Sequence, residues 1–205
     1  PDVPVYNTDG SWSGDEREGS GGSVNPIAKA LDEDIRLRRT GLQASVYSDI
    51  TFFKGLTLRS EVASDFGFVN AYTFKPTYKY GKIENINNES RWQFNQNTFW
   101  ELKNFITYNT SLLNHNVTVM AGQEVSEWRY EYLSGASTGL TSNDIHSPSL
   151  GQSSSHRIGS GFGSGAMASF FTRTAYNFND RYYATYTFRY DGSSNFGPEN
   201  RWAPF

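Results

Sequence analysis

The stretch from Tyr182 to Asp191 alternates strictly between two kinds of side chain. One register is wholly apolar or aromatic, and the other becomes more polar along the chain: Tyr182, Ala184, Tyr186, Phe188 and Tyr190 against Tyr183, Thr185, Thr187, Arg189 and Asp191. A period of two indicates a β-strand whose faces differ. A strand that is apolar on one face and wet on the other suits the wall of a transmembrane β-barrel.

The same period recurs in three pairs of segments joined by short turns. The pairs are 40–52 with 56–68, 92–112 with 117–133, and 166–178 with 182–190. Long loops are expected at the other strand ends, at 70–91 and 134–165. Short turns at one end and long loops at the other are typical of outer-membrane barrels. We therefore predict an all-β fold in which six or seven antiparallel, up-and-down strands form an arc of a large transmembrane β-barrel.

Two alternative interpretations compete with this membrane wall. A soluble sandwich strand also alternates, but Arg59, Glu61 and Asp65 on one face favour a solvated side over a second packed layer. Aromatic residues gather near the strand ends, as in the interfacial girdles of barrels. Cross-strand aromatic pairs, which stabilise any sheet, are the alternative reading of those residues.

The N-terminal segment, residues 1–36, is rich in Gly, Ser, Asp and Pro and is predicted to be an extracellular loop or a lead-in to the first strand. Asn25-Pro26 is a possible start for a helix through about Arg36. Residues 37–205 are then assigned to the barrel strands. The glycine-rich run Gly159–Gly165 is interpreted as part of a flexible loop, because it lacks the lysine of a phosphate loop and precedes no helix.

Composition excludes several classes of function. The chain has 205 residues, 18 Lys plus Arg and 21 Asp plus Glu, giving a formal net charge of −3. A scattered, slightly acidic charge argues against a nucleic-acid partner, which needs a basic face. Cysteine is absent, so disulfides, thiolate catalysis and cysteine-bound metal are excluded. No apolar run approaches the roughly 18 residues of a membrane helix.

No catalytic constellation or cofactor motif is present, so an enzyme is not predicted and no cofactor is expected. His115, His146 and His156 lie in a short turn and a serine-rich loop, without the spacing of metal ligands. The run Asp15–Glu18 offers oxygen ligands for calcium, but a solvated charge run is the stronger interpretation. No metal site is predicted.

The C-terminal sequence also resembles a known family. Asp191–Trp202 is similar to the stretch DGSSRFGxxNRW of SusC/RagA-type TonB-dependent outer-membrane transporters, with Asn195 where arginine is usual. Pro4-Val5-Tyr6 with Asp9-Gly10, followed by Asn25–Ala28, resembles that family's approach to a barrel strand. The resemblance runs in order over most of the chain. It identifies the chain as an internal barrel fragment that lacks the plug domain.

The resemblance implies TonB-dependent import of oligosaccharides or peptides across the outer membrane. It also implies a SusD-like surface lipoprotein as partner, and contact with TonB through the missing plug. Aromatic side chains among polar neighbours are candidates for facing the substrate, because rings stack on sugars and pack against peptide side chains; they are Tyr72, Tyr78, Tyr80, Trp92 and Tyr130. Each is equally a candidate girdle residue.

Tyr6 and Trp12 are the candidates for contact with the lipoprotein, since they offer the larger surfaces of the N-terminal segment. Two other functions stay open at this point. One is a secreted all-β carbohydrate-binding module, which would need no detergent. The other is an outer-membrane barrel with a structural or adhesive role, which would have no plug.

Overall fold

The structure, a computed structural model, describes residues 4–14 and 24–205, and strands dominate them. The long strands are β1 Asp34–Phe53, β2 Leu56–Lys75, β5 Glu89–Leu112, β6 His115–Thr138, β7 Arg157–Phe178 and β8 Tyr182–Ser193. The short elements are α1 Pro26–Asp32, β3 Tyr78–Tyr80, β4 Ile83–Asn85, β9 Trp202–Pro204 and the 3-10 turns Pro148–Leu150, Ser153–Ser155 and Pro198–Asn200.

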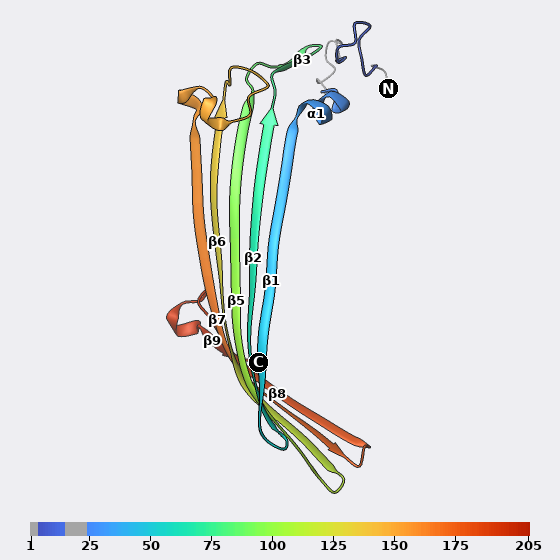
Figure 1. The fold of residues 1–205 in the computed structure, drawn as a ribbon, viewed down its shortest axis with the longest axis vertical. Helices are drawn as coiled ribbons and strands as arrows, with labels where there is room; N and C mark the ends of the chain where they lie inside the picture. Colours follow the sequence, from blue (N-terminus) through green and yellow to red (C-terminus); the bar gives the residue numbers. More distant parts are fainter. Residues whose placement is uncertain (1–3, 15–23) are drawn as a thin grey trace. The chain divides into compact units, whose positions relative to one another are not determined.

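Seven strands form one sheet in the order β1-β2-β5-β6-β7-β8-β9, while β3 and β4 form a separate hairpin (Figure 1). Each long strand is hydrogen-bonded to the long strand that precedes it in the chain. This is the predicted up-and-down arrangement, and the antiparallel arc of six or seven strands is confirmed. The sheet is open in the described residues, with β1 and β9 at its edges.

Contacts divide the chain into two compact units, and the long strands β1, β2, β5, β6 and β7 contribute to both. The loop unit comprises residues 1–40, 68–95 and 132–161. The hairpin unit comprises residues 41–67, 96–131 and 162–205.

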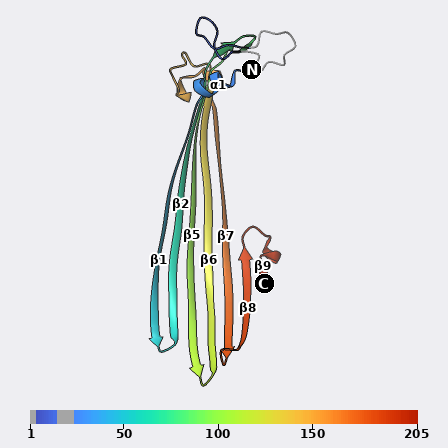
Figure 2. The same ribbon diagram turned by 90° about the vertical axis from the view of Figure 1, so that its right-hand side faces the viewer.

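In the hairpin unit, three tight turns lie at the same end of the strands (Figures 1 and 2). Gly55 in the first has φ +94°, and Asn179 and Asp180 in the third have φ 54° and 51°. Two consecutive residues with positive φ suit the type I′ hairpin turn, whose twist matches that of the strands, and Asn and Asp tolerate this backbone best after glycine. Residue type therefore indicates the first and third turns, whereas the second places Leu113 at φ 54°.

The apolar core is small and lies wholly in the loop unit. Among the described residues, the buried hydrophobic side chains are Ala28, Phe74, Tyr80 and Leu140. In the hairpin unit the large apolar side chains are largely exposed, including Leu42, Val46, Ile106 and Tyr186. Within residues 4–14 and 24–205, no second layer covers these side chains. No helix among the described residues is long and apolar enough to span a membrane.

The predicted helix is real but shorter than expected. Asn25 caps it by accepting hydrogen bonds from the backbone N–H groups of Ile27 and Ala28 at 3.1 and 3.2 Å, and Pro26 occupies the first turn. The helix ends at Asp32 because Glu33 is already extended and β1 begins at Asp34. The periodic Ile35 therefore belongs to a strand.

Two expected loops are also corrected. β2 continues to Lys75, so the connection to β5 is short and carries the β3–β4 hairpin. β6 continues to Thr138 and β7 begins at Arg157, which leaves only residues 139–156 as a loop. The glycine-rich run Gly159–Gly165 is a strand and not a flexible loop. The reason is that rings of β6 pack directly against the backbone of β7 at Gly161 and Gly165.

Candidate functional site

The odd-numbered residues of β8 and β7 build one face of the hairpin unit. Arg189 pairs with Phe171 and Asp191 with Ser169, while Phe188 pairs with Thr172 and Tyr186 with Thr174. Paired residues of an antiparallel sheet share a face. The register therefore separates Thr187 and Arg189 from Tyr186 and Phe188, as the alternation predicts. We call these the charged face and the apolar face.

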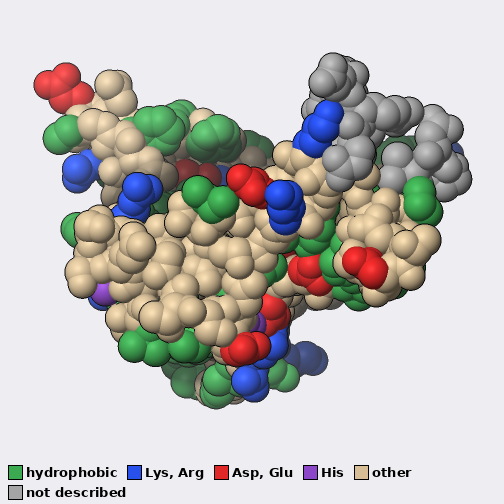
Figure 3. Space-filling view, turned by 90° about the horizontal axis from the view of Figure 1, so that it is seen from above, with side chains coloured by type: hydrophobic (Ala, Val, Ile, Leu, Met, Phe, Trp, Pro, Cys, Tyr) green, Lys and Arg blue, Asp and Glu red, His purple; other side chains and the backbone are tan. Residues whose placement is uncertain are grey.

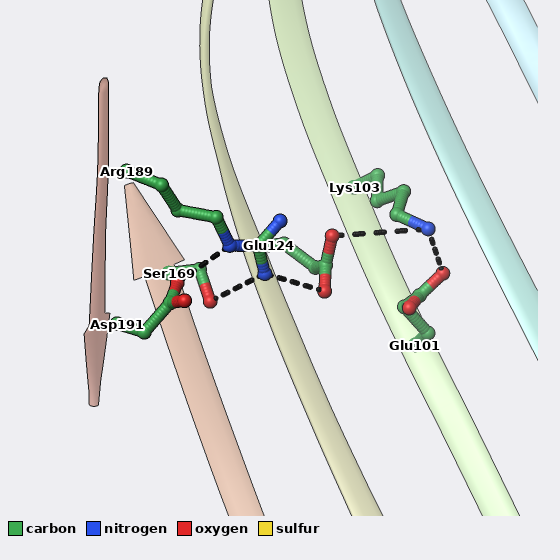
Figure 4. Close-up of polar contacts among 6 residues, drawn as sticks. All are labelled: Glu101, Lys103, Glu124, Ser169, Arg189 and Asp191. Carbon is green, nitrogen blue, oxygen red and sulfur yellow. Dashed lines mark hydrogen bonds and ion pairs between the residues drawn. The ribbon is translucent and has the colours of Figure 1, made fainter. Parts of the chain in front are cut away.

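A ladder of ionic contacts crosses the charged face from β5 to β8 (Figure 4). The Nζ of Lys103 lies 2.5 Å from Glu101 and 3.8 Å from Glu124. The guanidinium of Arg189 contacts Glu124 at 3.3 Å and Asp191 at 2.6 Å. With three carboxylates and two cations, the ladder links β5, β6 and β8 and leaves one negative charge in excess.

On β1 and β2 the charged face continues with a bidentate ion pair. The Nε and Nη2 of Arg59 donate to the two carboxylate oxygens of Asp49 at 2.7 and 2.6 Å. Asp65 accepts a 2.7 Å hydrogen bond from the amide of Gln43. No Lys or Arg of the described chain forms an ion pair with Asp65. Its charge is therefore not neutralised within this part of the protein.

Asp65 lies in an open trough on the charged face of the hairpin unit. Two adjoining cavities of about 350 and 330 Å³ share Asp65 and Phe99. The second cavity is lined by Gly67, which has no side chain to fill it, and by Asn97, Trp128 and Tyr130. This is where the structure places Tyr130, one of the predicted substrate-facing residues. Volumes of this size are common for ligand sites.

Glycines of β7 make room for large rings of β6. In the hairpin unit, a Cβ at Gly165 would lie 2.5 Å from Nε1 of Trp128, so the indole lies directly against the strand backbone. In the loop unit, a Cβ at Gly161 would lie 2.5 Å from the ring of Tyr132. The alternating glycines thus serve close cross-strand packing. Glycine in a strand often marks such an approach.

In the loop unit, Tyr72 and Trp92 line a cavity of about 240 Å³ together with Asp34, Arg36, Phe74 and His146. The rings of Tyr72 and Trp92 meet edge to face with centroids 5.3 Å apart. Of the five predicted substrate-facing residues, these two are brought together in one cavity. The cavity combines aromatic walls with a cation and an anion, because Arg36 donates to Asp34 at 2.7 Å.

His146 fastens the 139–156 loop over this cavity. Its ring stacks on Phe74 with centroids 3.9 Å apart, and its Nδ1 lies 3.4 Å from Asp34. Its carbonyl accepts hydrogen bonds from Ser90 and from the indole of Trp92. Asn88, with 2% exposure, bonds the backbone of Leu140 in both directions at 3.1 and 2.6 Å. His146 is a loop residue, as its sequence position indicates, but no signal in the sequence predicts this role.

Tyr78 and Tyr80 stack with centroids 4.4 Å apart, at the β3–β4 hairpin. Tyr80 is only 4% exposed, and its hydroxyl donates to Asp32, the last residue of α1. Burial, and then the hydrogen bond to Asp32, raise the pKa of the Tyr80 phenol. Here the ring of Tyr80 holds the hairpin to the helix, whereas Tyr78 is more open.

Tyr6 and Trp12 lie together in a small turn of the N-terminal segment. They form an isolated β-bridge, and their rings stack with centroids 4.8 Å apart. The indole of Trp12 donates to Asp32 at 3.3 Å, while Tyr6 is 52% exposed. Asn25 donates to the carbonyls of Val5 and Ser13 and fixes this turn to α1. The two predicted partner-contact residues therefore form one unit.

Within the described residues, no three His, Asp or Glu side chains gather in a way that would hold a metal. The possible calcium run Asp15–Glu18 lies outside the described residues. The view from above in Figure 3 shows basic and acidic side chains interspersed, with no single basic patch on that face.

Relatives of the chain are found among TonB-dependent receptors. TonB-dependent receptors P3 and P26 of Formosa agariphila are 27% and 29% identical over 100% and 98% of this chain. TonB-dependent receptor SusC of Bacteroides thetaiotaomicron is 24% identical over 88% of it. The chain spans about a fifth of the length of these relatives. No family model matches the chain.

Solved structures show the same fold. The structure of the RagAB peptide transporter aligns with this chain at a TM-score of 0.86 and 22% identity. The alignment covers 98% of this chain and 23% of the transporter chain. The RagAB peptide importer in the closed-closed state aligns at a TM-score of 0.85 and 23% identity, again covering 98% and 23%. These comparisons confirm the resemblance to SusC/RagA-type TonB-dependent transporters, and with it the arc of a barrel.

Proposed function

We propose that the chain is part of the barrel wall of a TonB-dependent transporter that imports nutrients, oligosaccharides or peptides, across the outer membrane. The observation that carries the proposal is the separation of the faces in the hairpin unit. An ionic ladder occupies one face, and apolar side chains that no other described residue covers as a second layer occupy the other. Lipid on the apolar face and water on the charged face account for both.

In this proposal the loop unit faces outward from the cell and offers the surfaces that substrate and partner meet. The cavity of Tyr72, Trp92 and Arg36 combines ring faces with donors and acceptors, as sites for sugars or peptides do. The exposed stack of Tyr6 on Trp12 supplies an aromatic anchor for a SusD-like lipoprotein. Energy reaches the protein through TonB and the plug domain.

The activity is tested with the complete transporter in its own cells. Deleting its gene should abolish growth on one class of nutrient, peptide or oligosaccharide, as sole carbon source. Deleting TonB should abolish uptake of the same nutrient while binding to the cell surface persists. Uptake that survives the loss of TonB would contradict import by this route and would favour a structural or adhesive barrel.

The partner is tested by co-purification of the intact complex in detergent. Replacing both Tyr6 and Trp12 by Ala should reduce recovery of the lipoprotein. Tyr6 is 52% exposed and can bury that surface against a partner. Replacing Tyr47, which lies under Arg59 in the hairpin unit, is the control. Undiminished recovery with the double variant would exclude this turn as the anchor.

A further inference from the structure

The part of β7 nearest Arg157 is a free sheet edge. On the β8 side, Ser194 is the last residue that bonds β7, through Ala166, and β7 continues for nine more residues, Arg157–Gly165 (Figure 2). Among residues 4–14 and 24–205, no strand pairs with that continuation on the side away from β6. About 30 Å of strand, at 3.3 Å per residue, therefore keeps one row of backbone groups unpaired.

The direction of those backbone groups follows from Ala166. Its C=O accepts from the N–H of Ser194 at 2.9 Å, and its N–H donates to the hydroxyl of Ser194 at 2.8 Å. In an antiparallel sheet, every second residue of a strand points both its N–H and its C=O to the same side. The free row therefore belongs to Ile158, Ser160, Phe162 and Ser164. All four are exposed, and Ile158 and Phe162 reach 85% and 87% exposure.

This edge lacks the features that usually keep exposed sheet edges from pairing. Proteins protect such edges with charged side chains, prolines or bulges. Between Ile158 and Gly165 the strand carries no proline and no charged residue. Glycines alternate with the four edge residues and add no side chain that would obstruct an approaching strand. The edge is therefore open to a partner strand.

An extended peptide is the ligand whose chemistry matches this row. The donors and acceptors of one strand edge repeat every two residues, about 6.8 Å, and another extended backbone presents the complementary groups at the same interval. An oligosaccharide has hydroxyl groups without that regular alternation. A bound strand would also continue the ladder that β7 and β8 already form up to Ser194.

We propose that the edge Ile158–Ser164 binds the nutrient as an extended peptide, which adds to the sheet as a strand. The inference rests on the proposed function and selects peptides from its two substrate classes. In that setting β8, with 12 residues, is about as long as a strand that crosses a bilayer, so β7 beyond Ala166 lies in water, where a peptide can reach it. Backbone bonding tolerates varied sequences, while Ile158 and Phe162 favour apolar or β-branched side chains opposite them.

Binding is measured by fluorescence anisotropy on the complete transporter purified in detergent. The probe is a fluorescein-labelled octapeptide of alternating valine and threonine. We expect this octapeptide to bind, and unlabelled maltoheptaose should not displace it. The same octapeptide with every amide N-methylated keeps its side chains but has no backbone N–H, so its affinity should be at least about tenfold weaker.

A pair of substitutions at one residue separates the backbone from the side chain. Ser160→Pro removes an N–H of the free row, at an edge position where proline is tolerated, and should weaken binding of the octapeptide about tenfold. Ser160→Ala keeps the N–H and should leave the affinity unchanged. Ser164→Pro tests the same row if Ser160→Pro lowers the folding yield.

Four results would overturn the proposal. They are equal binding of the N-methylated octapeptide, displacement of the octapeptide by maltoheptaose, equal affinities of the proline and alanine variants, and no binding at all, as expected if another segment of the transporter or its partner covers the edge. The proposed function fails separately. Peptide uptake that survives the loss of TonB would reject that function while peptide binding stands, whereas TonB-dependent uptake of an oligosaccharide without binding of the octapeptide would reject this inference alone.

Discussion

Arg189 on β8 reaches across β7 to Glu124 on β6, with 3.3 Å between the guanidinium and the carboxylate. The contact is possible because β7 places a small residue between them: Ser169 is 1% exposed and accepts a 2.9 Å hydrogen bond from the same guanidinium. One side chain thus ties three neighbouring strands on the charged face. Hydrogen bonds between strand backbones alone would join them only in pairs.

This relationship predicts that Glu124→Gln weakens the wall. The change leaves Lys103 and Arg189 facing each other without their shared anion, at a cost of about 1–2 kcal/mol in the free energy of unfolding after allowing for partial exposure. Denaturant unfolding of the complete transporter in detergent measures it. Arg129→Gln, which breaks a more exposed 3.7 Å pair with Glu127, is the control and should cost less than about 0.5 kcal/mol.

Gly165→Ala should also destabilise the hairpin unit. The added Cβ would lie 2.5 Å from the indole of Trp128, so the ring must move, at about 1–3 kcal/mol. The double variant with Trp128→Leu should recover part of this loss in the same unfolding experiment. Gly135→Ala meets nothing within 4 Å and serves as the control. Equal effects at the two glycines would argue against the ring-on-glycine packing.

Arginine on the apolar face should be far more harmful than arginine on the charged face. Leu102 lies next to Lys103 on β5 and points to the opposite face. Leu102→Arg should cost about 2–4 kcal/mol if that face meets the bilayer midplane, whereas Thr107→Arg on the charged face should be tolerated. Folding yield and heat stability in lipid vesicles compare the two. Similar values would contradict the assignment of the faces.

High pH should loosen the loop unit through Tyr80. Its pKa is raised in the folded protein, so the neutral phenol is favoured there; the stability it contributes is complete below the unfolded value of about 10 and is lost as pH rises through the higher folded value. As pH rises through the folded pKa of Tyr80, the absorbance of the phenolate and the rate of proteolysis in the loop unit should increase together. In Tyr80→Phe the alkaline loss of protection should be absent, with Tyr78→Phe as the control.

The strands and turns are the part of this fold that sequence reasoning reaches. Alternation and turn residues such as Asn179-Asp180 depend on local geometry, so they show in the sequence itself. The loop expected at 134–165 is shorter in the structure because glycine is ordinarily a loop signal, whereas Gly161 and Gly165 lie in a strand and make room for rings of the neighbouring strand. That requirement is visible only once the register is known.

The candidate site was only partly predictable for a similar reason. Tyr72 and Trp92 share a cavity, but His146 reaches them from a loop more than fifty residues away in sequence, and no local pattern marks that contact. Likewise, the excess charge of Asp65 appears only when the partners of its neighbours are known. Residue types indicated binding chemistry, and the fold decides which of those residues meet.

The central claim, that this sheet is a membrane wall with the loop unit outside the cell, is tested most directly by cysteine accessibility on whole cells. These 205 residues contain no cysteine. In the complete transporter, with any cysteine elsewhere replaced by serine, Thr141→Cys in the 139–156 loop and Asn114→Cys in the β5–β6 turn are introduced one at a time. The complete transporter carrying Thr141→Cys should react with an impermeant reagent, and the one carrying Asn114→Cys should react only after the cells are broken. The reverse pattern, or equal labelling of both on intact cells, would contradict the account.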